Sequence, residues 1–280
     1  MSLSAENLSS ADFDRLRSLI HKETGIHLTA EKRTMLEIRL KRRMRDLDFS
    51  SYGDYCNYLF RSGSRAREMV HLIDAVTTNK TDFFREPDHF EQLSSKALPE
   101  LDKQNGCNRR MLVWSAGCST GEEPYTLAMV LSEYAEGRPG LRFSLLATDI
   151  STAVLERARR GIFSSDDVRP VPHNLRKKYL MRSRQPGSDL VRVVPELRSK
   201  IEFRRLNFMD ADLGLSESPE IIFCRNVIIY FDRATQVRLL EKLVRQLAPG
   251  GYFFSGHSES LQNMDLPLTT VGSAVYRKTG

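Results

Sequence analysis

The spacing of apolar residues predicts two structural classes in succession along the chain. Up to about residue 76, apolar positions recur three or four residues apart, which is the period of helices with one buried face. Ser9 or Ser10 is a suitable cap for the first helix, and Gly25 is a suitable end. Further helical patterns cover residues 30–47, 52–60 and 65–73. We therefore expect residues 1–76 to form an all-α domain.

From residue 92 to residue 280 short apolar runs alternate with helical patterns, which is typical of an α/β domain. The runs cover residues 112–114, 143–148, 201–206, 220–224 and 252–255, and residues 269–271 and 274–277 are expected to add an antiparallel hairpin. Residues 164–200 are polar, irregular and too long for a plain loop, so they predict an inserted subdomain or a functional flap.

Residues 77–91 separate the two parts and differ from an ordinary linker. The segment is polar but contains Phe83 and Phe84, two aromatic residues that a simple connection has no need of. We expect both rings to be packed. Arg85 follows them, and a guanidinium there offers hydrogen bonds to a carboxylate. Pro87 marks the start of the next helix.

The turn between the first apolar run and its helix predicts a ligand site. Gly117 and Gly121 allow the backbone to come close to a ligand. Glu122 and Glu123 follow the turn, whereas a phosphate-binding turn carries no carboxylates at this place, and the two side chains would repel a pyrophosphate. They favour a ligand with positive charge and hydroxyl groups, such as S-adenosylmethionine. A helix-capping pair in an ordinary α/β domain is the alternative at this point.

Further polar residues follow the other apolar runs. Asp149 ends the second run, at the place where an acidic residue commonly accepts ribose hydroxyls, and Asn207 and Asn226 follow later runs. The carboxyl ends of parallel strands share one edge of a sheet. We therefore expect Gly117, Asp149, Asn207 and Asn226 to lie at one ligand-binding edge.

Charge adds a candidate docking surface to this outline. The chain has 280 residues, a formal net charge of +6 and 40% hydrophobic residues, which describes a soluble globular protein with an acidic partner. Between residues 32 and 45 seven cationic residues face a single acidic one: Lys32, Arg33, Arg39, Lys41, Arg42, Arg43 and Arg45 against Glu37. The stretch is either a solvated helix face or a docking surface for an acidic helix or nucleic acid.

Cysteine and histidine placement gives no indication of metal binding. The four cysteines (Cys56, Cys107, Cys118 and Cys224) lack C-x-x-C spacing, so we expect reduced thiols, with Cys118 packed. No histidine lies at metal-ligand spacing. The chain shows neither a signal peptide nor an apolar run long enough for a membrane span, and we expect a cytoplasmic protein.

An ordered set of motifs resembles the chemotaxis receptor glutamate O-methyltransferases, the CheR family. The motifs are T-D-F-F-R-E at 81–86, S-T-G-E-E-P-Y at 119–125, A-T-D-I at 147–150, F-C-R-N-V-I-I-Y-F-D at 223–232 and G-H-S-E-S at 256–260. The resemblance spans nearly the whole chain. It implies a helical N-terminal domain and a Rossmann-like methyltransferase domain into which a small antiparallel β subdomain is inserted.

The resemblance also implies the residues that contact S-adenosylmethionine and its product, S-adenosylhomocysteine. They are Asn79, Thr81, Arg85, Glu122, Asp149, Leu206, Asn207, Arg225 and Asn226. Arg85 and Tyr230 are expected to hold the incoming glutamate. Its carboxylate is already ionised at neutral pH, since a glutamate has a reference pKa of about 4.3. The reaction therefore needs alignment of oxygen, methyl carbon and sulfur instead of a general base.

The implied partners are methyl-accepting chemotaxis receptors. Their acidic helices are expected to dock at Arg39, Arg42 and Arg43, and the inserted subdomain binds a receptor C-terminal peptide by strand addition in some family members. A nucleic-acid methyltransferase is disfavoured because residues 32–45 contain no aromatic residue for base stacking. A non-catalytic scaffold and a nicotinamide dehydrogenase are further alternatives. A monomer is the default expectation.

Overall fold

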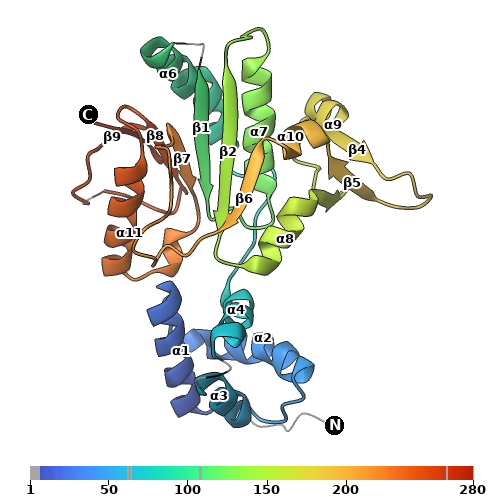
Figure 1. Ribbon diagram of the computed structural model, residues 1–280, viewed down its shortest axis with the longest axis vertical. Helices are drawn as coiled ribbons and strands as arrows, with labels where there is room; N and C mark the ends of the chain where they lie inside the picture. Colours follow the sequence, from blue (N-terminus) through green and yellow to red (C-terminus); the bar gives the residue numbers. More distant parts are fainter. Residues whose placement is uncertain (1–6, 62, 64, 107–108, 263, 280) are drawn as a thin grey trace.

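The protein is described here by a computed structural model that covers residues 7–61, 63, 65–106, 109–262 and 264–279. Figure 1 shows a helical domain at one end and an α/β domain above it, joined by an extended segment after α4 (Arg65–Val76). The carboxyl ends of the central strands point toward the helical domain. The space between the two domains is therefore bordered by strand ends, where α/β proteins bind ligands.

The helical domain confirms the all-α prediction for the N-terminal part. Its elements are α1 (Ser10–Thr24), η1 (Ala30–Lys32), α2 (Arg33–Asp46), α3 (Tyr52–Phe60) and α4. Ser9 caps α1 by accepting the Asp12 backbone N–H, and Gly25 ends it with φ 75°. Leu16, Leu36 and Leu72 lie in a separate hydrophobic core.

The α/β domain is built on a seven-stranded sheet in the order β6-β2-β1-β7-β8-β10-β9. The strands are β1 (Arg110–Ala116), β2 (Arg142–Asp149), β6 (Ile201–Arg205), β7 (Ile221–Cys224), β8 (Tyr252–Ser255), β9 (Leu268–Gly272) and β10 (Val275–Lys278). The first five in spatial order are parallel, and β10 pairs antiparallel with both β8 and β9. The predicted strands and the closing hairpin are confirmed.

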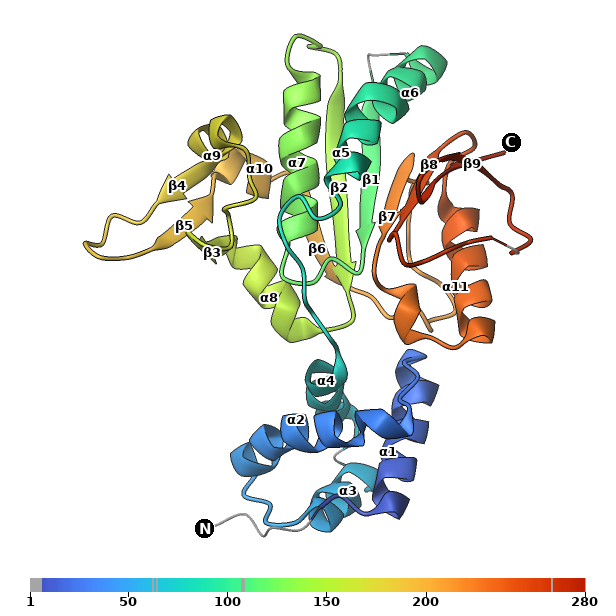
Figure 2. The ribbon, with the colours of Figure 1, turned by 180° about the vertical axis from the view of Figure 1, so that it is seen from behind.

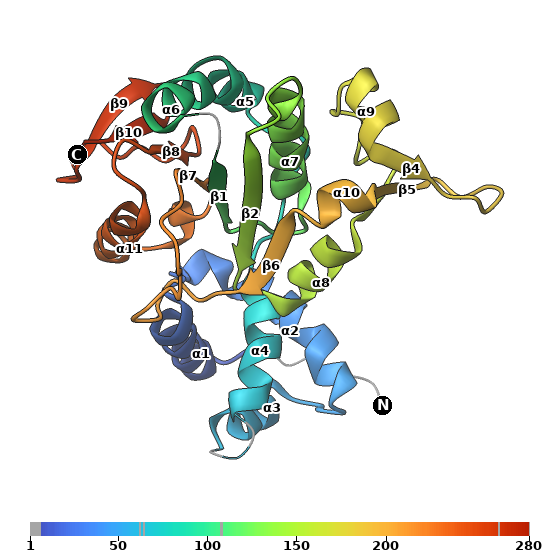
Figure 3. The ribbon, with the colours of Figure 1, turned by 45° about the horizontal axis from the view of Figure 1, so that its top comes forward.

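Helices cover both faces of this sheet (Figures 2 and 3). They are α5 (Pro87–Gln92), the π-helical turn η2 (Leu93–Ala97), α6 (Leu98–Asn105), α7 (Glu122–Ala135), α8 (Thr152–Arg160) and α11 (Arg233–Gln246). On β1, Val113 packs into the core shared with α5 to α8, while Trp114 packs into the core shared with α11. Alternate residues of one strand thus serve opposite faces, which explains why the central strands are apolar throughout.

A small antiparallel sheet projects from the α/β domain between α8 and β6 (Figure 1). It has the order β3-β5-β4, with β3 (Ile162–Ser164), β4 (Leu180–Arg182) and β5 (Leu190–Val193). The short helices α9 (His173–Tyr179) and α10 (Pro195–Arg198) accompany it. This is the inserted β subdomain that the sequence places at about residues 164–200.

Several smaller expectations concern burial and membrane spans. Phe83 is buried in the main core and Phe84 packs against it. Cys56, Cys118 and Cys224 are buried free thiols, and Cys107 lies outside the described residues. In the described part of the chain we find no helix with the length and apolar character needed to cross a membrane.

Candidate functional site

A cavity of about 1030 Å³, partly open to solvent, lies where the carboxyl ends of the strands meet the helical domain. Its lining comes from the turn after β1, from the ends of β2 and β7, from the 77–85 segment and from the end of α1. The sheet edge predicted from the sequence is thus the edge that faces the cavity.

The turn after β1 brings backbone, in place of side chains, to the cavity. Gly117 has φ 92°, and a Cβ built on it would lie 2.4 Å from Cγ2 of Val227. The N–H groups of Gly117 and Cys118 both donate to the Thr148 carbonyl oxygen, at 2.8 and 2.9 Å. The turn is therefore tied to β2, and glycine is required because no side chain fits between it and Val227.

Asp149 is held at the end of β2 by backbone donors on both sides. Its Oδ2 accepts the Ser119 N–H at 2.9 Å, and its Oδ1 accepts the Ser151 N–H at 3.0 Å. Burial raises the pKa of this carboxyl, while the backbone hydrogen bonds act in the opposite direction. Each oxygen retains a lone pair for a hydroxyl donor of a ligand.

Asn226 adopts a left-handed conformation, with φ 57°, directly after β7. Its N–H donates to Oε2 of Glu259 at 2.7 Å, and the Gly256 N–H donates to the same oxygen at 2.8 Å. Glu259 is 3% exposed, and burial raises the pKa of its carboxyl against the lowering effect of these backbone donors. Glu259 thus holds the Asn226 turn in place from beneath.

Arg225 supplies a buried positive charge at the cavity wall. Its side chain is 2% exposed and lies between two carboxylates, with Nε 3.4 Å from Oε2 of Glu86 and Nη1 3.6 Å from Oε2 of Glu123. It also donates to the Arg85 carbonyl oxygen. Burial raises the pKa of Glu123, and Arg225 is the largest opposing influence. Arg225 therefore links the 77–91 segment to the sheet.

The 77–91 segment and the helical domain close the cavity on the side opposite the sheet. The Ser119 hydroxyl donates to the Asn79 carbonyl oxygen at 2.9 Å, and Nη1 of Arg85 donates to the Lys80 carbonyl oxygen at 3.1 Å. Nδ2 of Asn207 donates to the Glu23 carbonyl oxygen at 2.6 Å. These bonds join both domains around one space.

The cavity brings together most of the residues that the sequence singled out. It is lined by Asn79, Thr81, Arg85, Asp149, Asn207, Arg225, Asn226 and Tyr230. Glu122 and Leu206 are not among the lining residues. The Thr120 hydroxyl donates to Oε2 of Glu122 at 2.6 Å, and Glu122 lies near Arg157, while the neighbouring Glu123 lines the cavity. The structure thus places the second carboxylate of the pair, and not the expected first one, at the cavity.

Two of the three arginines expected to dock receptors make internal contacts. Arg39 donates to the carbonyl oxygens of Val76 and Thr77, at 3.0 and 2.9 Å, and so holds the end of α4. Arg43 forms a two-pronged pair with Glu68, at 2.9 and 2.7 Å. Arg42 is exposed. Of the three, only Arg42 presents its charge to solvent without such a contact in the described structure.

Sequence reasoning missed two residues that shape the cavity and, from the residues alone, left open which carboxylate of the Glu122–Glu123 pair meets it. Ser119 donates to both Asp149 and Asn79, and Glu259 holds the Asn226 turn. Of the pair, Glu123 lines the wall. Glu259 belongs to the G-H-S-E-S motif, so a signal was present for it. Which face of α7 meets the cavity was decided by packing, and the sequence carried no signal for that choice.

Comparison with known proteins agrees with this geometry. Residues 79–277 match the family model described as the CheR methyltransferase, SAM binding domain, and residues 11–77 match the CheR methyltransferase, all-alpha domain. The chain belongs to the CheR methyltransferase family. It is therefore an S-adenosylmethionine-dependent protein-glutamate O-methyltransferase of the chemotaxis system, as the sequence motifs predicted.

Full-length relatives support the assignment. Chemotaxis protein methyltransferase 2 of Pseudomonas aeruginosa is 40% identical over 265 residues, which covers 95% of this chain and 92% of the relative. The Escherichia coli chemotaxis protein methyltransferase is 40% identical over 269 residues, covering 96% and 91%. The Borreliella burgdorferi protein of the same name is 38% identical over 275 residues, covering 97% and 95%. This methyltransferase thus aligns with these relatives along nearly its whole length.

Proposed function

We propose that the cavity between the two domains holds S-adenosylmethionine and that receptor glutamates are methylated at its mouth. The observation that carries the proposal is the convergence of Asp149, Arg85, and the pair Asn226 and Tyr230 on one cavity from three separate segments. In this proposal Asp149 accepts the ribose hydroxyls, and Glu123 supplies negative charge for the ammonium group. The cofactor supplies the methyl group as a sulfonium, and the protein supplies alignment.

Arg85 and Tyr230 are the proposed holders of the glutamate carboxylate. Arg85 uses Nη1 to donate to the Lys80 carbonyl oxygen, which fixes the guanidinium at the cavity, and its remaining N–H groups suit a carboxylate oxygen. Tyr230 is half-buried, and its own carbonyl oxygen accepts the His27 N–H at 2.8 Å. One hydrogen bond from each side chain would orient the carboxylate and leave one oxygen free to attack the methyl group.

The test measures methyl transfer by Arg85→Ala and Tyr230→Phe to receptor-containing membranes, with cofactor affinity measured separately by calorimetry. We expect kcat to fall about 10- to 100-fold, since a hydrogen bond to a charged group contributes about 1.5–3 kcal/mol. Tyr134→Phe is the matched control, because the Tyr134 hydroxyl donates to Asp102 and does not line the cavity. An unchanged kcat in both cavity variants, with cofactor bound normally, would refute the assignment.

Receptor docking is proposed for the exposed face of α2. Ile38 is 64% exposed there, and Lys41, Arg42 and Arg45 are exposed cations on the same helix. An apolar side chain among cations complements an acidic amphipathic helix. Methylation assays with receptor membranes and with RNA as competing acceptors distinguish this proposal from a nucleic-acid substrate. Transfer to RNA would contradict it.

A receptor C-terminal peptide is the proposed ligand of the β subdomain. Ile162 on β3 and Met181 on β4 lie opposite Arg192 of the central strand β5. Together with Leu190 of β5 they expose apolar side chains on one face of the small sheet. Peptide affinity, measured by fluorescence anisotropy, is expected to fall in Met181→Lys and to stay unchanged in Lys177→Met. Equal affinities would contradict this role.

We further propose that the enzyme works as a monomer in the cytoplasm, where receptor signalling helices are accessible.

A further inference from the structure

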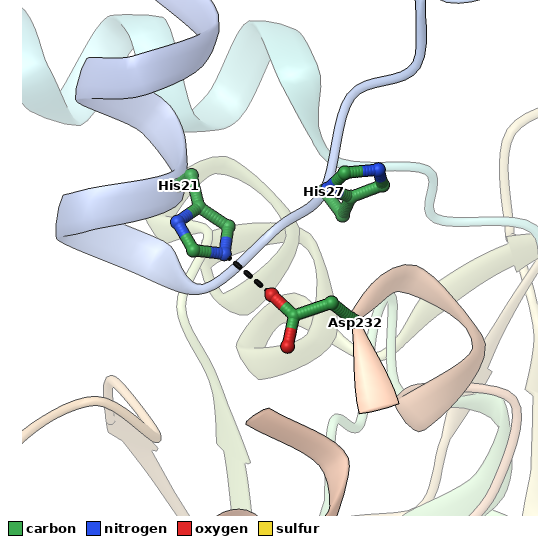
Figure 4. A group of neighbouring side chains, drawn as sticks. All are labelled: His21, His27 and Asp232. Atoms are coloured by element: carbon green, nitrogen blue, oxygen red, sulfur yellow. Dashed lines mark hydrogen bonds and ion pairs between the residues drawn. The ribbon is translucent and has the colours of Figure 1, made fainter. Parts of the chain in front are cut away.

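Two histidines of the helical domain meet an aspartate of the methyltransferase domain at the junction between them. Nε2 of His21, near the end of α1, lies 2.6 Å from Oδ2 of Asp232, 211 residues away in the sequence. Figure 4 shows the His27 ring on the other side of the connecting segment, with the Asp232 carboxylate below both rings. One donor atom from each residue lies within 4.8 Å of the other two.

We propose that His21, His27 and Asp232 form a binding site for Zn²⁺, or another divalent ion that prefers imidazole, and that the bound ion joins the two domains. Two imidazoles and one carboxylate are a common donor set for such ions, and a water molecule completes a tetrahedron. Zinc takes these ligands at about 2.0–2.2 Å, so two donors of one tetrahedral site lie roughly 3.3–3.5 Å apart, and the three donors here, which lie within 4.8 Å of one another, would be brought to that spacing by side-chain rotation.

The backbone around the three donors is fixed independently of any ion. The His27 N–H donates to the Tyr230 carbonyl oxygen at 2.8 Å, and Ile26 forms an isolated bridge with Phe231. Oδ1 of Asp232 accepts the Thr235 N–H at 2.9 Å as the cap of α11, which leaves Oδ2 directed at His21. Such supporting contacts orient ligands before a metal binds.

The proposed site is open to solvent. The side chains of His21 and Asp232 are 44% and 33% exposed, which leaves a path for entry.

A second group of potential ligands is less suitable. Glu86, His89 and His257 also have donor atoms within 4.8 Å of one another. However, Nε of Arg225 lies 3.4 Å from the Glu86 carboxylate, and this buried cation opposes a second one. His89 is also fully buried, which closes the entry path that the His21 group has.

The location gives the ion a specific consequence. Ile26 and Tyr230 both line the cofactor cavity and flank the proposed ligands in sequence. An ion bound to His21, His27 and Asp232 would therefore fasten the end of α1 to the segment that carries Tyr230. We expect hydrogen exchange to slow in residues 24–28 and 230–233 when Zn²⁺ is added.

The experiment uses the full-length protein, freed of metal by a chelator, and titrates it with Zn²⁺ in a calorimeter. His21→Gln, His27→Gln and Asp232→Asn should each weaken Zn²⁺ binding at least about ten-fold, the lower end of what loss of a supporting group costs at metal sites. Asparagine still caps α11, and circular dichroism checks that each variant folds. Binding of Co²⁺ should give the visible absorption of a four-coordinate site in the wild type and lose it in the three variants.

Two controls keep the outcome decisive. His173→Gln changes an exposed histidine on α9 and should leave Zn²⁺ binding unchanged. His257→Gln tests the second group directly. The proposal is overturned if Zn²⁺ fails to bind the wild type, if the three folded variants bind it as well as the wild type does, or if only His257→Gln abolishes binding.

Discussion

The Glu259 carboxylate lies beneath the Asn226 backbone and accepts its N–H at 2.7 Å. The same oxygen accepts the Gly256 N–H, so one buried side chain accepts hydrogen bonds from two turns that converge below the cavity between the two domains. Glu259→Ala leaves these donors without a partner in the interior. We expect it to lower the free energy of unfolding by about 1–3 kcal/mol and to weaken cofactor binding.

Chemical denaturation and calorimetry with S-adenosylhomocysteine check this expectation. Glu259→Gln is the matched variant, since its amide oxygen can accept both N–H groups at the position of Oε2, while its NH₂ group replaces Oε1, which accepts the Ile229 N–H at 3.3 Å. It should retain part of the stability and affinity that Glu259→Ala loses. Wild-type behaviour of Glu259→Ala would show that Glu259 does not position the Asn226 turn.

Gly117 is predicted to tolerate no side chain. Its φ of 92° alone costs an L residue about 1–2 kcal/mol, and an added Cβ would contact Val227 at 2.4 Å. Gly117→Ala should therefore destabilise the protein and abolish measurable cofactor binding. The double variant Gly117→Ala/Val227→Ala removes the contact but keeps the strain, so it should regain part of the affinity. If the double variant binds no better than the single one, the contact with Val227 is not the cause.

Asp149→Asn is expected to weaken binding of S-adenosylmethionine at least about ten-fold, because asparagine can accept only one of the two backbone N–H groups and turns an NH₂ toward the other. Those donors belong to Ser119 and Ser151. Calorimetry gives the affinity, and Asp210→Asn, at an exposed position, serves as the control. Equal affinity in Asp149→Asn and the wild type would remove Asp149 from the proposed site.

Substitutions of Arg42 and Arg43 are predicted to have different effects, although the two residues are adjacent. Arg43→Ala leaves the Glu68 carboxylate, whose side chain is 1% exposed, without its cationic partner and with only the Tyr55 hydroxyl, at 3.0 Å, still donating to it; the change should cost about 3–5 kcal/mol of stability. Arg42→Glu should leave stability unchanged and raise the KM for receptor at low salt.

Thermal unfolding and methylation kinetics separate the two effects. Arg43→Met/Glu68→Met is expected to restore part of the stability that Arg43→Ala loses, since it removes both charges but leaves the buried Tyr55 hydroxyl without its acceptor. A normal receptor KM in Arg42→Glu at low salt would contradict docking at α2.

His89 is expected to make stability fall in mild acid. Burial, with a second contribution from the Arg225 charge, lowers the pKa of His89 to about 4 from its ordinary value of 6.5. Between these values the unfolded chain binds a proton that the folded protein does not, so His89 reduces the unfolding free energy as the pH falls from 6.5 to 4. Above 6.5 it has no such effect. Denaturation between pH 4 and 7 should show a shallower slope in His89→Gln, and identical slopes would contradict this origin.

The sequence determined the helices and strands of this protein and the edge of the sheet at which the ligand-binding residues were expected. Apolar runs and helical periods marked the strands and helices, because side chains on one face recur every two residues in a strand and every 3.6 residues in a helix. Gly117, Asp149 and Asn226 could be grouped in advance because each follows a strand and parallel strands end on the same side. The 81–86 and 223–232 motifs identified the family.

Only the tertiary structure decided which side chains point where. Glu122 and Glu123 are neighbours on α7, yet only Glu123 lines the cavity, because helix packing sets which face turns inward. A basic run does not reveal that Arg43 pairs with a buried carboxylate of another helix. His21 meets Asp232 only because the two domains dock, and a contact across 211 residues is fixed by packing and leaves no local pattern to read.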